Sequence, residues 1–224
     1  MTLPVKMSDG SIGTMELPAL MPFDVLEYLI NVCGLRLDDK VLASFWGHLD
    51  KVGDEWSKST ADYRRGVPGQ VWPLGLYGDE AVVGLINNPF LKVVGLFLSV
   101  PLYRPSSTRL SRYLLFAVES DKIVSFPETV FPVLRAIVVS MNRLSETGIG
   151  STYFLCSEIR GDQGFFKHIL RHKSWWKDSF ICFRCRANIK SGRSNYLRYD
   201  GWTNTRHTLE SFFETELTTL PLCA

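Results

Sequence analysis

Three apolar segments in close succession, then an amphipathic segment and a fourth apolar one, constrain the fold of this chain most. The four apolar segments are residues 71–77, 92–101, 112–119 and 152–160. β-Branched and aromatic residues dominate them, which is typical of strands. Residues 128–147 repeat apolar side chains at helical spacing, with Thr129 as a candidate cap and Gly148 as a stop. The sequence therefore predicts three strands, a helix and a fourth strand, in that order.

This order predicts an α/β fold with a mixed sheet. Short links join the first three strands, so we expect an antiparallel meander. The helix then returns the chain to a fourth strand beside the first, by a crossover that is normally right-handed. A further helix is expected at residues 165–172. The resulting order of three strands, helix, strand and helix is similar to that of the ribonuclease H-like fold.

The remaining segments are predicted to flank this core. Residues 1–21 read as an irregular arm, and helical spacing predicts two helices, at 23–32 and 39–52. Residues 54–70 are polar and punctuated by Gly and Pro, which indicates a loop. We divide the chain into an N-terminal arm and helical segment packed on the core (1–70), the ribonuclease H-like core (71–172) and a C-terminal appendage (173–224).

Two aspartates follow a glycine at the end of the first and fourth predicted strands. They are Asp79, after Gly78, and Asp162, after Gly161. In the predicted order these strands are neighbours, so both carboxylates would meet at one exposed edge. Carboxylate oxygens suit a hard divalent cation such as Mg²⁺, and paired ions can assist phosphoryl displacement. The alternative is that both Gly-Asp pairs are turns, for which these residue types are common.

Positive charge is concentrated in one segment. The chain has a net charge of +2, but residues 160–206 carry eleven Lys or Arg against three Asp, which gives this segment +8. Such a surplus favours a polyanionic partner, most simply nucleic acid, although a solvated basic face has the same composition. Aromatic residues are interleaved with these charges and suit stacking on unpaired bases. The side chains expected to contact phosphate are Arg184, Arg186, Lys190 and Arg193.

A Cys-x-x-Cys pair lies within the same segment. Cys182 and Cys185 have the spacing of a zinc knuckle, and His207 is the best candidate for a further ligand. Other candidates are His168, His172 and Cys156. Because no second Cys-x-x-Cys accompanies the pair, two packed or free thiols remain the alternative.

Four short stretches together resemble the catalytic region of cut-and-paste DNA transposases of the DDE class. The resemblance is greatest to the CACTA/Mirage/Chapaev-type group and to transposon-derived proteins, and it covers roughly residues 70–205. The matching stretches are Pro73-Leu74-Gly75-Leu76-Tyr77-Gly78-Asp79, Ser111-Arg112-Tyr113-Leu114-Leu115-Phe116, Glu158-Ile159-Arg160-Gly161-Asp162 and Ile181-Cys182-Phe183-Arg184-Cys185-Arg186-Ala187. The specificity of the resemblance comes from their order.

The resemblance implies DNA strand cleavage and transfer. Asp79 and Asp162 would take the positions of the first two catalytic acids, and two Mg²⁺ or Mn²⁺ ions would be held with a third acid on a later helix. The candidates for that third acid are Glu210, Glu214 and Glu216. The family usually places it after a longer insertion, and the chain reaches Ala224 without an evident end-binding domain. We therefore expect a truncated or domesticated derivative.

Composition limits the membrane association and the cellular compartment that we expect. No apolar stretch reaches the ~18 residues that span a bilayer, and the N-terminus has no signal-peptide pattern, so we expect no membrane partner. Five cysteines in a chain of this size favour a reducing compartment, nuclear or cytoplasmic. An oligomer is compatible with the sequence.

These observations favour a transposase-derived protein that interacts with DNA and is either a degenerate metal-dependent strand transferase or nuclease, or a non-enzymatic binding or scaffold protein that retains the fold. Whether it is an enzyme stays open at this point, because no third acid stands at the usual place.

Overall fold

The computed structural model of the chain describes residues 1–83, 91–103, 105, 111–162 and 165–166. The chain divides into two compact units, Met1–Asp162 and Gln163–Ala224. Only two residues of the second unit are described, so the architecture below is that of the first unit. The helix predicted at 165–172 lies outside the described residues except for Phe165 and Phe166, which are helical.

A mixed four-stranded sheet forms the centre of the first unit, in the spatial order β5-β4-β3-β6. Its strands are β3 (Gln70–Val82), β4 (Lys92–Ser99), β5 (Arg112–Glu119) and β6 (Thr152–Gly161). β4 is antiparallel to both β3 and β5, whereas β6 is parallel to β3. The predicted α/β class and the predicted pairing of first and fourth strands are confirmed. β3 is longer than predicted, because its pairing with β4 continues to Val82.

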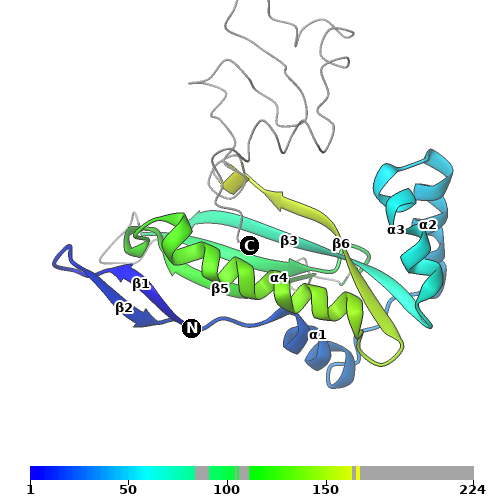
Figure 1. Ribbon diagram of the computed structural model, residues 1–224, viewed down its shortest axis with the longest axis horizontal. Coiled ribbons are helices and arrows are strands. Elements are labelled where there is room, and N and C mark those ends of the chain that lie inside the picture. The colour runs from blue at the N-terminus through cyan, green and yellow to red at the C-terminus, as the bar shows by residue number, and fades with distance from the viewer. Residues whose placement is uncertain (84–90, 104, 106–110, 163–164, 167–224) are drawn as a thin grey trace, which may run out of the picture. The chain divides into compact units, whose positions relative to one another are not determined.

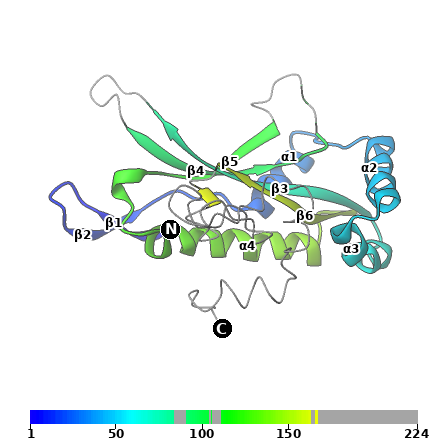
Figure 2. The ribbon, with the colours of Figure 1, turned by 90° about the horizontal axis from the view of Figure 1, so that it is seen from above.

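Helix α4 (Phe131–Glu146) connects β5 to β6 and lies along one face of the sheet, as Figures 1 and 2 show. The sheet and the helix bury alternating or helically spaced apolar residues. Those of β4 are Val94, Leu96 and Leu98, and those of α4 are Val133, Ile137 and Leu144. Their period of two in the strand and about 3.6 in the helix places the core between the two layers. The opposite face of the sheet is therefore the more accessible one.

The N-terminal residues form a β-hairpin, so the predicted irregular arm was wrong. β1 (Thr2–Lys6) pairs antiparallel with β2 (Ile12–Glu16). Leu3 and Val5 are buried, and Val5 also bridges to Ile123. The hairpin is fixed by contacts with residues more than a hundred positions away, which local sequence patterns do not reveal.

The start of α4 also differs from the prediction. The turn η2 (Ser120–Lys122) and the π-helical turn η3 (Phe126–Val130) precede the helix. Ser125 caps η3 by accepting from the amide of Glu128 at 3.3 Å, whereas α4 itself begins without a side-chain cap, so Thr129 is not its cap. Thr129 is fully buried, and its hydroxyl donates to the carbonyl of Pro4 at 2.8 Å. It therefore attaches the N-terminal hairpin to the core.

Three helices precede the sheet: α1 (Pro22–Asn31), α2 (Asp39–Val52) and α3 (Glu55–Gly66). The first two agree with the predicted segments. The loop predicted at 54–70 was wrong, because most of that segment is α3. Asp54 caps this helix by accepting from the amide of Ser57 at 2.9 Å. Among the described residues, none of the helices has the length and hydrophobicity needed to cross a bilayer.

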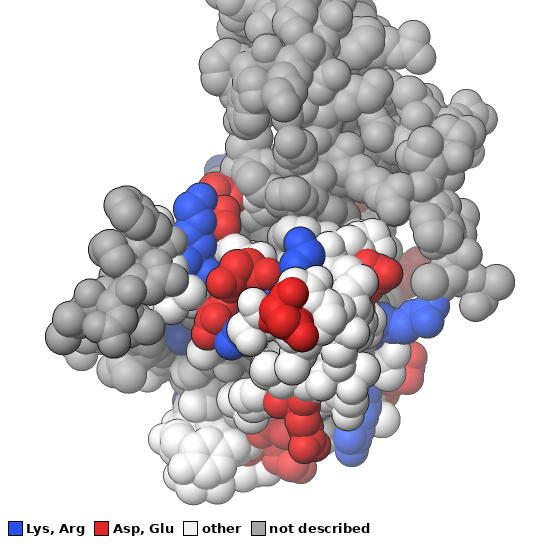
Figure 3. All heavy atoms as spheres, turned by 90° about the vertical axis from the view of Figure 1, so that its left-hand side faces the viewer, with Lys and Arg blue, Asp and Glu red and all other residues white. Residues whose placement is uncertain are grey.

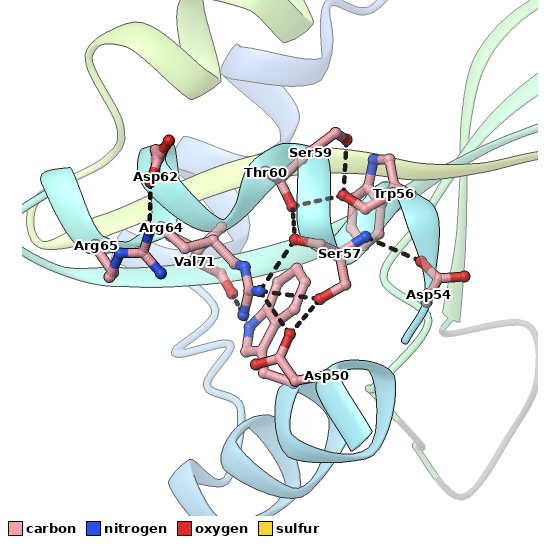
Figure 4. A network of polar contacts seen from close by, with 11 residues as sticks. Asp50, Asp54, Trp56, Ser57, Ser59, Thr60, Asp62, Arg64, Arg65 and Val71 are labelled. Atoms are coloured by element: carbon pink, nitrogen blue, oxygen red, sulfur yellow. Dashed lines mark hydrogen bonds and ion pairs between the residues drawn. The ribbon is translucent and has the colours of Figure 1, made fainter. Parts of the chain in front are cut away.

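A polar network centred on a buried serine joins α2 to α3 (Figure 4). The hydroxyl of Ser57, which is fully buried, donates to Asp50 at 2.5 Å and accepts from Arg64 Nη2 at 2.9 Å. Arg64 also pairs with Asp50 at 2.8 Å, and its guanidinium lies 4.2 Å from the ring centroid of Trp46. The indole of Trp46 donates to the carbonyl of Val71 at 3.0 Å. The helical pair is thus connected to the first residues of β3.

Candidate functional site

The pairing of β3 with β6 places Asp79 and Asp162 at adjacent positions. The last residues paired between the two strands are Gly78 and Gly161, and each aspartate is the next residue in the chain, Asp79 within β3 and Asp162 just after the end of β6. Adjacent strands lie about 4.8 Å apart, and residues in register on parallel strands point to the same face. Asp79 is half-buried and Asp162 is exposed. Gly78 and Asp79 lie within β3, so the alternative of a Gly-Asp turn is wrong at this position.

A β-bulge in β6 determines which face the second aspartate occupies. The register runs from Gln70↔Thr152 to Leu74↔Cys156, then shifts so that Gly75 pairs with Glu158. Ser157 is the extra residue, and its hydroxyl donates to the carbonyl of Leu74 at 2.9 Å. If Ser157 took a place in the ladder instead of bulging out, Asp79 would be opposite Gly161, and Asp162 would point to the other face. The bulge therefore brings the two carboxylates together.

Tyr77 holds the carboxylate of Asp79 from the same face. Its hydroxyl donates to Asp79 Oδ2 at 2.6 Å, across the two-residue repeat of the strand. This hydrogen bond is the main reason that the pKa of Tyr77 is raised above its ordinary value, and desolvation adds to it. On the tyrosine ring lies the guanidinium of Arg112, with its carbon 4.3 Å from the ring centroid. A cation, an aromatic ring and a carboxylate thus follow one another on this face.

Glycine at position 75 allows side chains from neighbouring strands to meet over β3. A Cβ at Gly75 would collide with Ser99 Oγ and come within 2.7 Å of Glu158 Oε1. Glu158 in turn pairs with Arg160 at 2.6 Å. The absence of a side chain at residue 75 therefore leaves space for polar groups of β4 and β6 beside Tyr77.

These side chains line a shallow hollow of about 270 Å³ next to the aspartate pair. Its strand residues are Tyr77, Ser99, Arg112, Glu158 and Arg160. The hollow carries two guanidinium groups and one carboxylate, and so a local charge of about +1 at neutral pH.

Carboxylates as donors suit a hard divalent cation. Asp79 and Asp162 could supply one carboxylate each, with Asp79 Oδ2 already accepting from Tyr77. Within the described part of the chain, no group of three or more His, Cys, Asp or Glu side chains is arranged to hold a metal ion. The candidates for a third acid, Glu210, Glu214 and Glu216, lie outside the described residues.

The other predicted site residues also fall outside the described part of the chain. They are the zinc candidates Cys182, Cys185 and His207, with His168 and His172, and the phosphate candidates Arg184, Arg186, Lys190 and Arg193. Cys156 is described and is an exposed free thiol on β6.

Sequence reasoning identified the two aspartates but missed Tyr77, Arg112 and the Glu158–Arg160 pair. The signal for Tyr77 and Arg160 was the strand period, since each lies two residues before an aspartate. Arg112 carried no such signal, because it reaches Tyr77 from β5, across β4.

Charge on the described surface of the first unit is mixed. Figure 3 shows acidic and basic side chains interspersed on the side that it views. The strongly basic segment predicted to bind nucleic acid begins at residue 160, and almost all of it lies beyond the described residues.

Comparisons of the chain with models of protein families, with curated proteins and with solved structures found no match.

Proposed function

We propose that this chain is a transposase-derived protein with a ribonuclease H-like domain, in which Asp79 and Asp162 hold a divalent cation against a DNA phosphodiester. The single observation that carries the proposal is the register of β3 and β6. Gly78 pairs with Gly161, and the Ser157 bulge turns both following carboxylates to one face. Two acids 83 positions apart in sequence thereby reach adjacent positions.

The strand order supports the same proposal. An antiparallel meander, a crossing helix and a fourth strand parallel to the first give the spatial order β5-β4-β3-β6. This is the order expected of the ribonuclease H-like fold, to which the resemblance with DDE-class transposases also leads. In such a sheet the acids of the first and fourth strands belong to one site.

Each residue has a definite role in the proposed chemistry. Asp79 and Asp162 hold Mg²⁺ or Mn²⁺, which, when bound, supplies Lewis-acid activation of a phosphoryl oxygen and of the attacking water or hydroxyl. Tyr77 fixes the carboxylate of Asp79 through its 2.6 Å hydrogen bond. This contact restricts the rotation of the carboxylate and leaves Oδ1 to face the ion.

A second candidate function is DNA binding without catalysis. It is favoured by the surplus of eleven Lys or Arg over three Asp in residues 160–206, which suits a polyanion whether or not the site is catalytic. In this case the basic segment at 160–206 would supply the affinity, and binding would weaken steeply with salt.

The two candidates are separated by nicking of supercoiled plasmid with the full chain in Mn²⁺. We expect Asp79→Asn and Asp162→Asn each to lower the nicking rate at least ~100-fold, because each removes a charged ligand from the ion. Asp121→Asn is the matched control, since Asp121 is exposed in the turn η2. Its nicking rate should equal that of the wild type.

Circular dichroism of each variant establishes that the fold is retained. Nicking that persists in both aspartate variants would overturn the enzymatic proposal. Absence of nicking in the wild type, together with salt-sensitive DNA binding that both variants retain, would favour the binding protein.

A further inference from the structure

We propose that the hollow beside the aspartate pair binds a phosphodiester of the nucleic-acid strand, with Arg112 and Arg160 as positioning residues. This inference rests on the proposed function and adds a subsite to it. The hollow lies between Arg112 at the start of β5 and the Glu158–Arg160 pair of β6, over Tyr77 and Ser99.

The charge of the hollow selects an anion. Among the described residues, no carboxylate lies within ion-pairing distance of Arg112. Arg160 is paired with Glu158 at 2.6 Å, yet 62 % of its side-chain surface is accessible. A guanidinium has five N–H donors, so Arg160 can keep this pair and still donate to a phosphate oxygen. Arginine is the residue best suited to phosphate because its planar fork gives two parallel hydrogen bonds.

Tyr77 fixes the direction of Arg112. The guanidinium lies on the tyrosine ring, 4.3 Å from its centroid, and stacking of this kind restricts a flexible side chain. The same tyrosine donates to Asp79. Tyr77 therefore holds the proposed phosphate-binding group, Arg112, with its ring and the proposed metal ligand, Asp79, with its hydroxyl.

Position along the strands connects the hollow with the site of chemistry. Arg160 lies two residues before Asp162, and Tyr77 lies two residues before Asp79. The side-chain repeat of a strand is about 6.6 Å, so a phosphate in the hollow would be one repeat from the proposed ion. A polymer with regularly spaced phosphates can occupy both places at once, whereas a single free phosphate cannot.

The size of the hollow agrees with this occupant. Its volume of about 270 Å³ is slightly below the roughly 300–1,000 Å³ of pockets that enclose a drug-sized ligand. It therefore suits a phosphate with part of its sugar, and leaves the bases of a strand outside.

The test measures binding of the 5′-phosphorylated thymidine dinucleotide pTpT to the full chain, by calorimetry in EDTA. We expect Arg112→Gln to weaken binding roughly 10-fold, since a charge-assisted hydrogen-bond pair is lost. Arg112→Lys should recover only part of the affinity, because lysine keeps the charge without the planar fork. The matched control is Arg135→Gln, an exposed arginine of α4, which should bind as the wild type does.

Two further variants separate this inference from the proposed function. Asp79→Asn and Asp162→Asn should keep the Arg112-dependent binding of pTpT even though they lose nicking. If pTpT binding depended on Arg112 but the wild type did not nick DNA, the phosphate-binding role of the hollow would be supported and the catalytic proposal refuted. If nicking required both aspartates but Arg112→Gln bound pTpT as the wild type does, only the phosphate-binding role of the hollow would be overturned.

The last measurement replaces pTpT by inorganic phosphate at equal ionic strength. It should bind at least ~10-fold more weakly than pTpT, since in EDTA the aspartate pair holds no ion and only the dinucleotide also places part of its sugar in the hollow. Equal affinity for both ligands would overturn the assignment of the hollow to a nucleic-acid strand.

Discussion

At the scale of the residue, stability at the helical pair depends on a few satisfied polar groups. Ser57 has no exposed surface, and its hydroxyl both donates to Asp50 and accepts from Arg64. Arg64 Nε, by contrast, is buried without a hydrogen-bond partner among the described residues. An unpaired buried polar group lowers stability. The ring of Trp46, which lies beneath the guanidinium of Arg64, compensates for part of the lost hydration.

This network makes stability depend on pH through one carboxylate. The hydrogen bond from Ser57, followed by that from Arg64, holds the pKa of Asp50 below its ordinary value. A lowered pKa means that the stabilisation is present above the unfolded-state pKa of about 3.9 and is lost as the pH falls through the folded-state value. We expect the difference in melting temperature between wild type and Asp50→Asn to be constant above about pH 5 and to shrink below about pH 4.

The measurement is a series of thermal melts between about pH 2.5 and 6. Asp62→Asn is the control, because Asp62 forms an exposed pair with Arg65 on the same helix, and exposed pairs contribute little. A difference between wild type and Asp50→Asn that did not change with pH would contradict the role given to Asp50.

At the scale of the element, the Ser157 bulge takes up one extra residue of β6 and so keeps Asp162 aligned with Asp79. Deletion of Ser157 should let β6 pair with β3 in a continuous register that keeps Glu158 opposite Gly75 and leaves Arg160 and Asp162 on their present face, because Glu158 would then follow Cys156 directly. We expect the deletion variant to retain Mn²⁺ binding, nicking and its strand content. Mn²⁺ binding by electron paramagnetic resonance and circular dichroism measure the two properties.

Ser157→Ala is the matched variant for the deletion. It keeps the extra residue and loses only the hydrogen bond to the carbonyl of Leu74. Its Mn²⁺ affinity should stay within about threefold of the wild type, which corresponds to less than ~1 kcal/mol. Loss of Mn²⁺ binding after the deletion, with strand content retained, would contradict the register assigned to β3 and β6.

Elements with a strong local period were predictable, and those held by distant contacts were not. The strands β4 and β5 and the helix α2 follow their period closely, because burial on one face dictates it. Helix α3 is polar on most sides and buries a serine, so its sequence resembles a loop. The bulge in β6 is invisible to any local pattern, since a register shift exists only between two strands.

The candidate site was predictable to the same extent. The sequence indicated both aspartates, because each follows a glycine after an apolar run. It did not indicate that their common face depends on Ser157. Nor did it identify Arg112 and Tyr77 as neighbours, because their contact spans three strands.

At the scale of the whole molecule, the first unit has a single core to which the N-terminal hairpin, the helical pair and the sheet all attach. Thr129 bonds the hairpin to the core, and Trp46 bonds α2 to β3. Tyr63 of α3 also donates to the carbonyl of Ser145 in α4. These contacts join segments from both ends of the unit, so we expect it to unfold cooperatively.

The core residue Ile137 tests this cooperativity. It is fully buried on α4, so Ile137→Ala should lower the free energy of unfolding by about 2–5 kcal/mol. Val138, the next residue, is 50 % exposed, and Val138→Ala should change this free energy by less than about 0.5 kcal/mol.

Urea titrations compare the two regions. Circular dichroism follows the sheet, and the assigned indole N–H resonance of Trp46 follows the helical pair. Because Trp46 donates to Val71 of the sheet, both midpoints should move together in Ile137→Ala. If only the sheet midpoint moved, α2 and α3 would be an independent folding unit, and the single core inferred for residues 1–162 would be wrong.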